Sequence, residues 1–365
     1  MSENAAAGIL PAHQISELVE AGQIIPETPL SRDQIQPASL DLRLGRTAYR
    51  VRASFLPGPS ITVADRLDRL KLHEIDLSEG AVLETGCVYI VPLMESLKLP
   101  ADISAAANPK SSTGRLDIFT RVITDRAREF DSVPSGYSGG LYLEVSPRTF
   151  PILARAGSRL SQIRFRRGAA RLYDAELLEL HRKVGLVDGM PNISNGIAVS
   201  IDLTAGAGGF VGFRAKRHTG LVDVDKRALC DVLDYWEPLP PDRRTELVLD
   251  PDQFYILVSR EAVHVPPEYA AEMMPYDPLV GEFRVHYAGF FDPGFGHNEA
   301  GGAGSRAVLE VRSHEIPFIL EHGQVVGRLV YEHMVERPKK LYGDDIGSHY
   351  QAQGLKLSKH FRSLD

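Results

Sequence analysis

One six-residue segment of this chain has the composition of a phosphate-binding loop. Directly after Pro109 it places two cations, three hydroxyls and a glycine, in the order Lys110, Ser111, Ser112, Thr113, Gly114 and Arg115. Hydroxyls and backbone N–H groups donate hydrogen bonds to phosphate oxygens, glycine permits close approach, and the arginine fork can bind two oxygens at once. Because the same residue types are common in surface turns, an ordinary turn is the alternative. The spacing GxxxxGK[ST] of a Walker loop is not met.

Two glutamates occur within apolar, strand-like runs: Glu144 in LYLEV and Glu310 in AVLEV. Alternation along a strand places each glutamate on the face opposite its leucine neighbour. A carboxyl group held in a partly desolvated pocket has a raised pKa and becomes a candidate general base or acid. Because glutamate is rarely buried, an ordinary solvent-facing strand residue is the simpler interpretation. Both remain candidate catalytic residues.

A tight DPG turn in HYAGFFDPGFG begins 18 residues before Glu310. Such a turn can line a base pocket with backbone groups, and its Asp292 could hold a sugar hydroxyl. Capping the turn is the commoner role for an aspartate before proline. The segment AREFDSVPSGYSG, which contains Asp131, is a degraded counterpart with the same two options.

The tail LYGDDIGSHYQAQGLKLSKHF is polar, rich in glycine and basic near its end. A frayed terminus is the default for a chain end. The alternative is a flap that closes over an anionic nucleotide, with side chains such as Tyr342, His349, Tyr350, Gln353 and Lys359.

Several known catalytic signatures are missing from the sequence. The zinc deaminases use HxE with PCxxC to hold their metal, and neither pattern occurs, so no protein-bound metal and no zinc are expected. GxSxG, HExxH and GxGxxG are not found where they could work. The histidines are scattered singly, which is typical of surface or core residues rather than ligands.

An internal repeat organises the chain. GLYLEVSPRTFPILARAGSRLSQIRF corresponds to RAVLEVRSHEIPFILEHGQVVGRLVY, so that Glu310 follows Glu144 by 166 residues. Pro100 and Pro266 are separated by the same offset, and QPASLDLRLG resembles VSIDLTAG more weakly. We interpret the chain as two copies of one β domain, the first over 1–175 and the second over 186–365. Duplication alone says nothing about chemistry.

The elements that must position these residues are mostly short strands. Segments such as 40–51, 87–93, 118–124, 140–146 and 161–166 are β-branched or alternating and are separated by Gly, Pro and Asp turns. Helices are predicted over 12–22, over DAELLELHRKVG near the boundary between the copies, and over KRALCDVLDYW, residues 226–236. The fold class is therefore mainly β, with a few short helices.

Composition limits the class of protein. The net charge of −7 argues against a protein that coats nucleic acid, and no apolar run approaches the length of a membrane helix. Cys87 and Cys230, the only cysteines, are too few for a disulfide framework. No secretory signal is recognisable, so a cytoplasmic protein is expected, with a small nucleotide rather than nucleic acid or membrane as its partner.

Taken together, QPASLDLRLG, PKSSTGRL, AGFFDPGFG, VLEV, GQVVGRLVYE and the tail resemble the dCTP deaminase family, a relative of the trimeric dUTPases. The resemblance runs from about residue 9 to the C-terminus. It implies two tandem dUTPase-like distorted β-barrels, of the β-clip or jelly-roll-like kind. It also implies a homo-oligomer, a trimer or a multiple of it, with Mg²⁺ bound alongside the nucleotide triphosphate.

The resemblance also implies roles for individual residues. The 110–115 loop would grip the substrate, Asp292 the sugar, Val308 and Leu309 the base edge, and Glu310 would activate water. Tyr342 and Gln353 match tail positions that reach the nucleotide, whereas His349 stands where the family commonly has lysine.

The second copy has YDPLVGEF where the phosphate loop is expected, without the cluster of hydroxyls and cations. We therefore predict a composite site, in which the first copy supplies the 110–115 loop and the second supplies Glu310, with Glu144 as the weaker catalytic candidate. The predicted reaction is hydrolysis of dCTP to dUTP and ammonia by water attack at C4 of cytosine. A dUTP diphosphatase, a bifunctional enzyme continuing to dUMP, and a non-catalytic nucleotide sensor are the alternatives.

Overall fold

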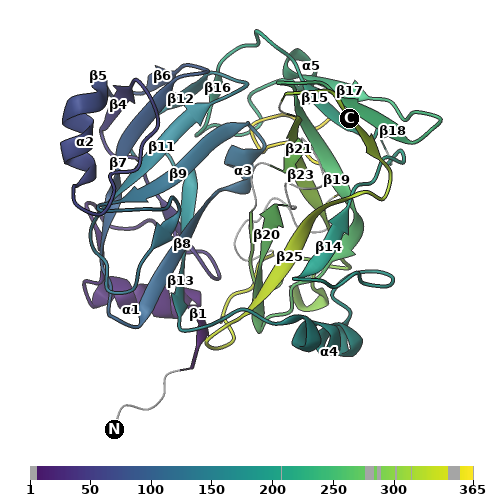
Figure 1. Cartoon of the computed structure of the whole chain (residues 1–365), viewed down its shortest axis with the longest axis horizontal. Coiled ribbons are helices and arrows are strands. Elements are labelled where there is room, and N and C mark those ends of the chain that lie inside the picture. Colours follow the sequence, from purple (N-terminus) through teal and green to yellow (C-terminus); the bar gives the residue numbers. More distant parts are fainter. Residues whose placement is uncertain are drawn as a thin grey trace.

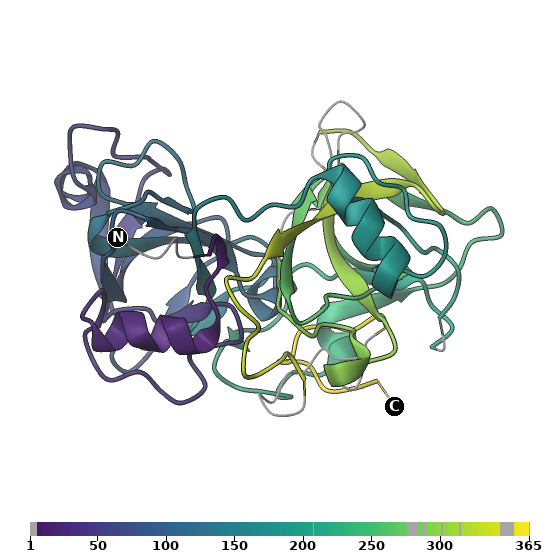
Figure 2. The ribbon, with the colours of Figure 1, turned by 90° about the horizontal axis from the view of Figure 1, so that it is seen from below.

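The chain forms two β-rich domains that lie side by side (Figures 1 and 2). We analysed a computed structural model, which describes residues 6–206, 208–275, 283–285, 289–300, 302–313, 315–343 and 354–364. Strands dominate both domains, which confirms the prediction of a mainly β fold. No helix in these described ranges is long and apolar enough to cross a membrane.

Three sheets build the first domain. One has the order β1-β13-β8-β10, with β3 paired to β13, and a second has the order β5-β4-β7-β11-β9, with β2 paired to β7. The third joins β6 and β12 to β16. The strands of the first domain are β1 (Gly8–Ile9), β2 (Ile24–Pro26), β3 (Leu40–Leu42), β4 (Thr47–Val51), β5 (Lys71–Asp76), β6 (Ala81–Leu83), β7 (Val88–Lys98), β8 (Ile103–Pro109), β9 (Ile118–Thr124), β10 (Ser132–Val133), β11 (Ser138–Pro147), β12 (Ile152–Ala154) and β13 (Ser161–Arg167).

The second domain repeats this arrangement. Its sheets have the orders β14-β25-β20-β22, β17-β15-β19-β23-β21 and β18-β24. The strands are β14 (Ile197–Ser200), β15 (Gly212–Ala215), β16 (Val222–Asp223), β17 (Trp236–Leu239), β18 (Glu246–Leu249), β19 (Phe254–Val263), β20 (Tyr269–Pro275), β21 (Phe283–Val285), β22 (Phe290–Phe291), β23 (Ser305–Ser313), β24 (Phe318–Glu321) and β25 (Val325–His333).

Strand register supports the repeat that the sequence indicates. In the first domain Glu144 on β11 lies opposite Ile90 on β7. In the second, Glu310 on β23 lies opposite Ile256 on β19. Each glutamate is therefore 54 residues beyond its cross-strand isoleucine, and the two copies share one register. A slip of one residue would have turned one of the two glutamates to the other face of its sheet.

Helices are few and short: α1 (Ala12–Glu20), α2 (Val63–Leu70), α3 (Ser111–Gly114), α4 (Asp174–Val184), α5 (Val232–Tyr235) and η2 (Asn298–Ala300). α1 and α4 occupy the segments predicted to be helical, and α4 ends at Gly185, whose φ of 65° favours glycine. The predicted helix over 226–236 is wrong except for its last turn. The backbone N–H groups of Leu229 and Cys230 instead donate to the carbonyl of His360 in the tail.

Packing joins the two domains into one core. β16 of the second domain pairs in parallel with β12 of the first, opposite Ile152 and Leu153. Phe150 of the first domain meets the rings of Tyr235 and Trp236 edge-on, at centroid distances of 5.6 and 5.4 Å. The largest apolar cluster accordingly contains residues of both domains. Burial of aromatic rings is the main energetic contribution to such a joint.

A buried ion pair also links the domains. The guanidinium of Arg312 on β23 donates to the carboxylate of Asp117 in the first domain and to the hydroxyl of Thr149, at 3.0 Å for the latter. Its other arm donates to the carbonyl of Asp252 at 2.8 Å. Asp117 is 1% exposed and Arg312 7%. Both charged groups are therefore largely shielded from water.

We expect Arg312→Ala to lower the free energy of unfolding by about 3–5 kcal/mol, because it removes the cation beside a buried carboxylate. Chemical denaturation measures this change. Arg243→Ala, at an exposed arginine of the same domain, is the control and should leave the midpoint unchanged. Equal stability of the two variants would contradict a structural role for the pair.

Candidate active site

The 110–115 loop is a single helical turn between two strands. β8 ends at Pro109, α3 spans Ser111–Gly114, and β9 begins at Ile118. The carbonyl of Lys110 accepts from the N–H groups of Thr113 and Gly114 at 2.8 and 3.0 Å. Ser112, Thr113 and Arg115 are buried, whereas Ser111 is half-buried and lies against Gly289 of the second domain. The loop thus faces the other domain rather than open solvent.

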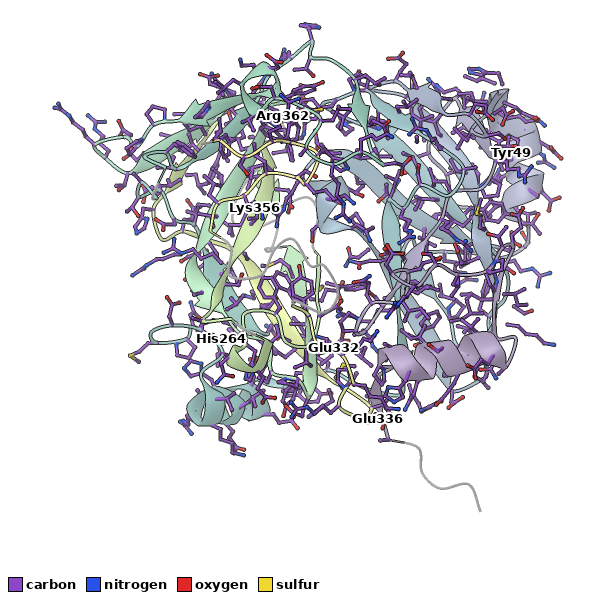
Figure 3. All side chains as sticks on the ribbon, turned by 180° about the vertical axis from the view of Figure 1, so that it is seen from behind. Tyr49, His264, Glu332, Glu336, Lys356 and Arg362 are labelled. Carbon is purple, nitrogen blue, oxygen red and sulfur yellow. The ribbon has the colours of Figure 1, made fainter. Side chains whose placement is uncertain are left out.

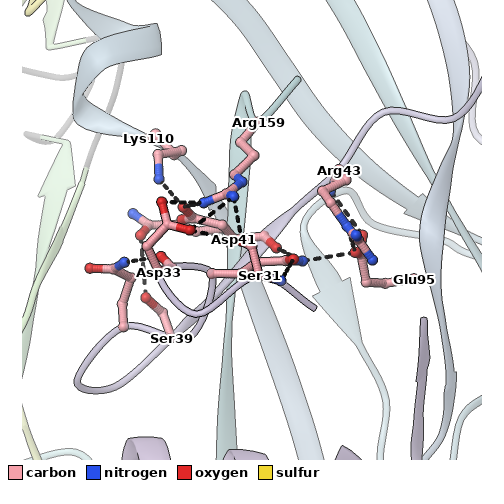
Figure 4. Close-up of polar contacts among 11 residues, drawn as sticks. Ser31, Asp33, Ser39, Asp41, Arg43, Glu95, Lys110 and Arg159 are labelled. Atoms are coloured by element: carbon pink, nitrogen blue, oxygen red, sulfur yellow. Dashed lines mark hydrogen bonds and ion pairs between the residues drawn. The ribbon is translucent and has the colours of Figure 1, made fainter. Parts of the chain in front are cut away.

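Lys110 is held by an acidic neighbour that sequence analysis did not single out. Its ammonium contacts the carboxylate of Asp41, which also lies 3.6 Å from Arg159 (Figure 4). Arg159 in turn donates to Asp33, and this hydrogen bond lowers the pKa of Asp33 to about 2. Lys110 is therefore oriented by a charged network, and binding a phosphate there would compete with Asp41.

Glu310 lies inside the molecule next to this loop. Its carboxylate is 3.8 Å from Nε of Arg115, and the two residues are only 4% and 3% exposed. Burial raises the pKa of Glu310 to about 8, although the Arg115 guanidinium works in the opposite direction. The structure therefore brings together the arginine of the first copy and the glutamate of the second within one chain.

Glu144, the counterpart of Glu310, has a different environment. Arg121 donates to one of its carboxylate oxygens through Nε and a terminal nitrogen, at 3.0 and 2.7 Å. The guanidinium is stacked on the ring of Phe130 at 3.5 Å and also contacts Ser54. Arg121 thus forms a direct ion pair with Glu144.

The DPG turn is fastened by an arginine of the first domain. Arg164 on β13 donates to the carboxylate of Asp292 at 3.0 Å and to the carbonyls of Ala271 and Phe291 at 3.0 and 3.3 Å. Its guanidinium also lies over the ring of Phe290 at 4.1 Å. Burial raises the pKa of Asp292, which is 7% exposed. Nothing in the sequence distinguished Arg164 from the other arginines of its strand.

The strand register identifies a residue other than Asp131 as the counterpart of Asp292 in the first domain. Phe291 pairs with Ala271, and Val133 pairs with Ala105, which is the repeat partner of Ala271. Pro134, rather than Asp131, is therefore equivalent to Asp292. The side chain of Asp131 accepts from the N–H of Val122 at 2.7 Å, and burial raises its pKa to about 7. The Asp131 side chain therefore binds the backbone of β9 rather than capping its own turn.

The two predicted base-edge residues lie on β23, next to Glu310. Leu309 is 1% exposed and its side chain packs in the core of the second domain, so only its backbone can meet a ligand. Val308 lies opposite Val258 of β19. In the described chain β21 covers the other edge of β23 only opposite Val311, Arg312 and Ser313.

The tail contacts both the DPGF turn and the 110–115 loop. The N–H of Tyr342 donates to the carbonyl of Pro293 at 2.8 Å, and its ring lies 5.6 Å from that of Phe295 in the DPGF turn. Further along, the carbonyl of Lys356 accepts from Arg115 at 3.0 Å. His349 and Gln353 lie outside the described residues. Sequence analysis did not anticipate this backbone contact, because no side-chain signal carries it.

Comparisons with known families cover both domains. The model of the 2'-deoxycytidine 5'-triphosphate deaminase N-terminal domain matches residues 6–169, and that of the C-terminal domain matches residues 173–361. The chain belongs to the dCTP deaminase family. The resemblance inferred from the motifs is thereby confirmed.

Individual relatives agree with this assignment. A solved structure entitled crystal structure of 2'-deoxycytidine 5'-triphosphate deaminase from Agrobacterium tumefaciens is 70% identical, covers 90% of this chain and 99% of its own, and has a TM-score of 0.87. A dCTP deaminase of Shewanella amazonensis is 32% identical over 163 residues, which are 42% of this chain and 80% of the relative. A "dCTP deaminase, dUMP-forming" of Coprothermobacter proteolyticus is 31% identical over 160 residues, 43% of this chain and 81% of the relative.

This dCTP deaminase family member should lose stability as pH rises through the range set by Glu310. In the folded chain the carboxyl holds its proton up to a pKa of about 8, whereas an unfolded chain releases it near 4.5. Between these two pH values, unfolding therefore releases a proton. The contribution of the protonated Glu310 carboxyl to the free energy of unfolding is fully present below pH 4.5 and is lost as the pH rises through about 8. We expect Glu310→Gln to abolish this decline and to exceed the wild type by on the order of 4 kcal/mol at pH 8.

Denaturation of both proteins at pH 5 and pH 8 checks the expectation. Glu321→Gln, at an exposed strand glutamate, is the control and should retain the wild-type slope. A wild-type slope for Glu310→Gln would mean that the Glu310 carboxyl is ionised in the folded chain at neutral pH.

Proposed function

We propose that this chain hydrolyses dCTP to dUTP and ammonia at a site shared by its two domains. The observation that carries the proposal is the 3.8 Å separation between Arg115 of the first domain and Glu310 of the second, both buried. Membership of the dCTP deaminase family and the name of the 70%-identical solved relative indicate the substrate and the reaction.

In the proposed mechanism Glu310 accepts a proton from a water molecule, whose oxygen attacks C4 of cytosine. The carboxyl passes this proton to N3, and the proton left on the new C4 hydroxyl is then transferred to the amine. The bond between C4 and the amine breaks, ammonia leaves, and C4 becomes the carbonyl of uracil. A group that takes up and returns a proton is most effective when its pKa lies near the working pH, and burial of Glu310 supplies that condition. The positioned base contributes roughly 10²–10⁴-fold, so alignment and stabilisation of the adduct must supply the rest.

The other predicted residues are proposed to hold the substrate. The hydroxyls of Ser111, Ser112 and Thr113, with Lys110, Gly114 and Arg115, would bind the triphosphate. On the second domain Asp292 would meet the sugar, the backbone of Val308 and Leu309 the base edge, and the tail residues Tyr342, His349 and Gln353 would complete the enclosure.

Magnesium is proposed to enter with the triphosphate. The side chains of the 110–115 loop are donors and cations, which suit phosphate oxygens rather than a metal, and no cluster of three or more metal-ligating side chains is found among the described residues. The phosphates themselves would therefore hold the ion, whose chemistry there is neutralisation of their charge.

Glu144 is the weaker candidate for the base because Arg121 already pairs with it. Both hydrogen bonds from Arg121 go to the same carboxylate oxygen of Glu144, so a water molecule would have to compete with the guanidinium for that oxygen. The first domain would then contribute the 110–115 loop and no second base.

The name of one relative indicates dUMP as an alternative product. The Coprothermobacter protein is named as dUMP-forming, and the bifunctional reaction would continue from dCTP to dUMP with release of pyrophosphate. Separation of the products distinguishes the two reactions, while binding without turnover would indicate a nucleotide sensor. The homo-oligomer stays a prediction. Arg115 and Glu310 meet within one chain, so their contact does not require a second chain.

We expect Glu310→Gln to reduce ammonia release from dCTP with Mg²⁺ by ~10²–10⁴-fold, the range for a lost general base. Glu144→Gln should still release ammonia, and Glu321→Gln serves as a neutral control. Ammonia assay and chromatography of dUTP and dUMP measure the outcome. If only the Glu144 substitution abolished release, the role of base would belong to the first domain.

Arg115 provides a test through pH dependence. The kcat/KM of the wild type should rise with pH around the pKa of about 8 of Glu310, because the base must be ionised in the free enzyme. Arg115 lowers that pKa, so Arg115→Met should move the inflection to higher pH, whereas Arg115→Lys, which keeps the charge, should move it less. An unchanged inflection in Arg115→Met would separate Arg115 from the ionisation of Glu310.

A further inference from the structure

Four residues of the tail between positions 357 and 361 are buried, in contrast to the frayed terminus that is the default for such a segment. Leu357, Ser358, His360 and Phe361 are 8%, 2%, 2% and 6% exposed. Figure 3 labels Lys356 and Arg362 on this stretch of the ribbon. This segment is therefore part of the folded core.

Phe361 anchors the segment where both domains meet. Its ring lies 6.3 Å from Phe150 of the first domain, 5.4 Å from Tyr235 and 5.8 Å from Trp236. The N–H of Arg362 donates to the carbonyl of Cys230 at 3.0 Å. Edge-to-face packing of this kind fixes a chain end at low entropic cost, because aromatic side chains have few rotatable bonds.

From this anchor the segment runs back across the 110–115 loop and makes two hydrogen bonds to it. Arg115 donates to the carbonyl of Lys356 at 3.0 Å. The hydroxyl of Ser358 donates to the carbonyl of Ser112 at 2.8 Å, in a buried position. The loop is thus held at its middle and at its end by residues more than 240 positions away.

His360 holds Ser358 in turn. Its Nε2 lies 2.9 Å from the carbonyl of Val224, which can only accept, so this nitrogen carries the proton. Its Nδ1, which then carries no proton, lies 2.9 Å from the hydroxyl of Ser358, whose single proton is therefore shared between Nδ1 and the carbonyl of Ser112. Burial lowers the pKa of His360 to about 4, so the ring is neutral at physiological pH. Val224 is itself bound to the carbonyl of Leu153 in β12 at 3.2 Å.

We propose that Ser358 and His360 are positioning residues that hold the 110–115 loop in its phosphate-binding conformation through the chain of contacts from Val224 to Ser112. Neither side chain touches the substrate in this role. The inference rests on the proposed function, since it assigns a purpose to the loop. In this role the buried tail end acts as a brace of the site.

The test uses the full-length chain and the variants Ser358→Ala, His360→Ala and His360→Gln, with Leu364→Ala as a matched control at an exposed residue of the same segment. The loop contacts phosphates in both the ground and the transition state, so its loss acts on KM rather than kcat. We expect Ser358→Ala and His360→Ala to raise the KM for dCTP on the order of five-fold, the factor for one lost hydrogen bond. His360→Gln, whose amide can donate to Val224, should recover part of the loss.

Amide hydrogen exchange of the nucleotide-free proteins gives a second readout that needs no turnover. Exchange should accelerate in residues 111–115 of Ser358→Ala and stay unchanged in β18 and β24, which lie elsewhere in the second domain. Wild-type KM values in both alanine variants, unchanged exchange in 111–115, or acceleration spread over both domains would each overturn the proposal. Failure of the wild type to release ammonia would refute the proposed function alone, because the exchange result would still stand.

Discussion

The site depends on one contact between ionisable groups of different domains, the guanidinium of Arg115 and the carboxyl of Glu310. Burial of the pair has two consequences of opposite sign. Removal of water raises the pKa of the carboxyl, while the adjacent guanidinium, less screened than in water, favours ionisation. The pKa of Glu310 therefore depends on how the two domains pack against each other.

Several elements that are not proposed to react with the substrate contribute to the packing between the domains. β16 extends a sheet of the first domain, Trp236 and Phe361 complete an aromatic cluster around Phe150, and Arg164 fastens the DPG turn from across the boundary. Each contact joins a segment of the second domain to the first. A single-copy relative could not build these joints within one chain, because each requires both copies.

Duplication left the same framework around two glutamates and different neighbours beside them. The register of β7 with β11 matches that of β19 with β23, so Glu144 and Glu310 occupy equivalent places. Arg121 pairs directly with Glu144, whereas the guanidinium of Arg115 stands 3.8 Å from Glu310 and also binds the tail. The two equivalent glutamates therefore differ in how closely a cation is paired with each carboxyl group.

Periodicity and short motifs are local properties of the chain, and they were enough to predict the repeat, the mainly β fold, the family and the segments that carry polar chemistry. Three-dimensional packing was needed to establish which glutamate meets Arg115, that Lys110 faces Asp41, and that residues 226–231 are not helical but bind the tail. These outcomes depend on contacts between residues far apart in the sequence. Some of the contacts are made by backbone N–H and C=O groups, which are the same whatever the side chain. No local pattern encodes them.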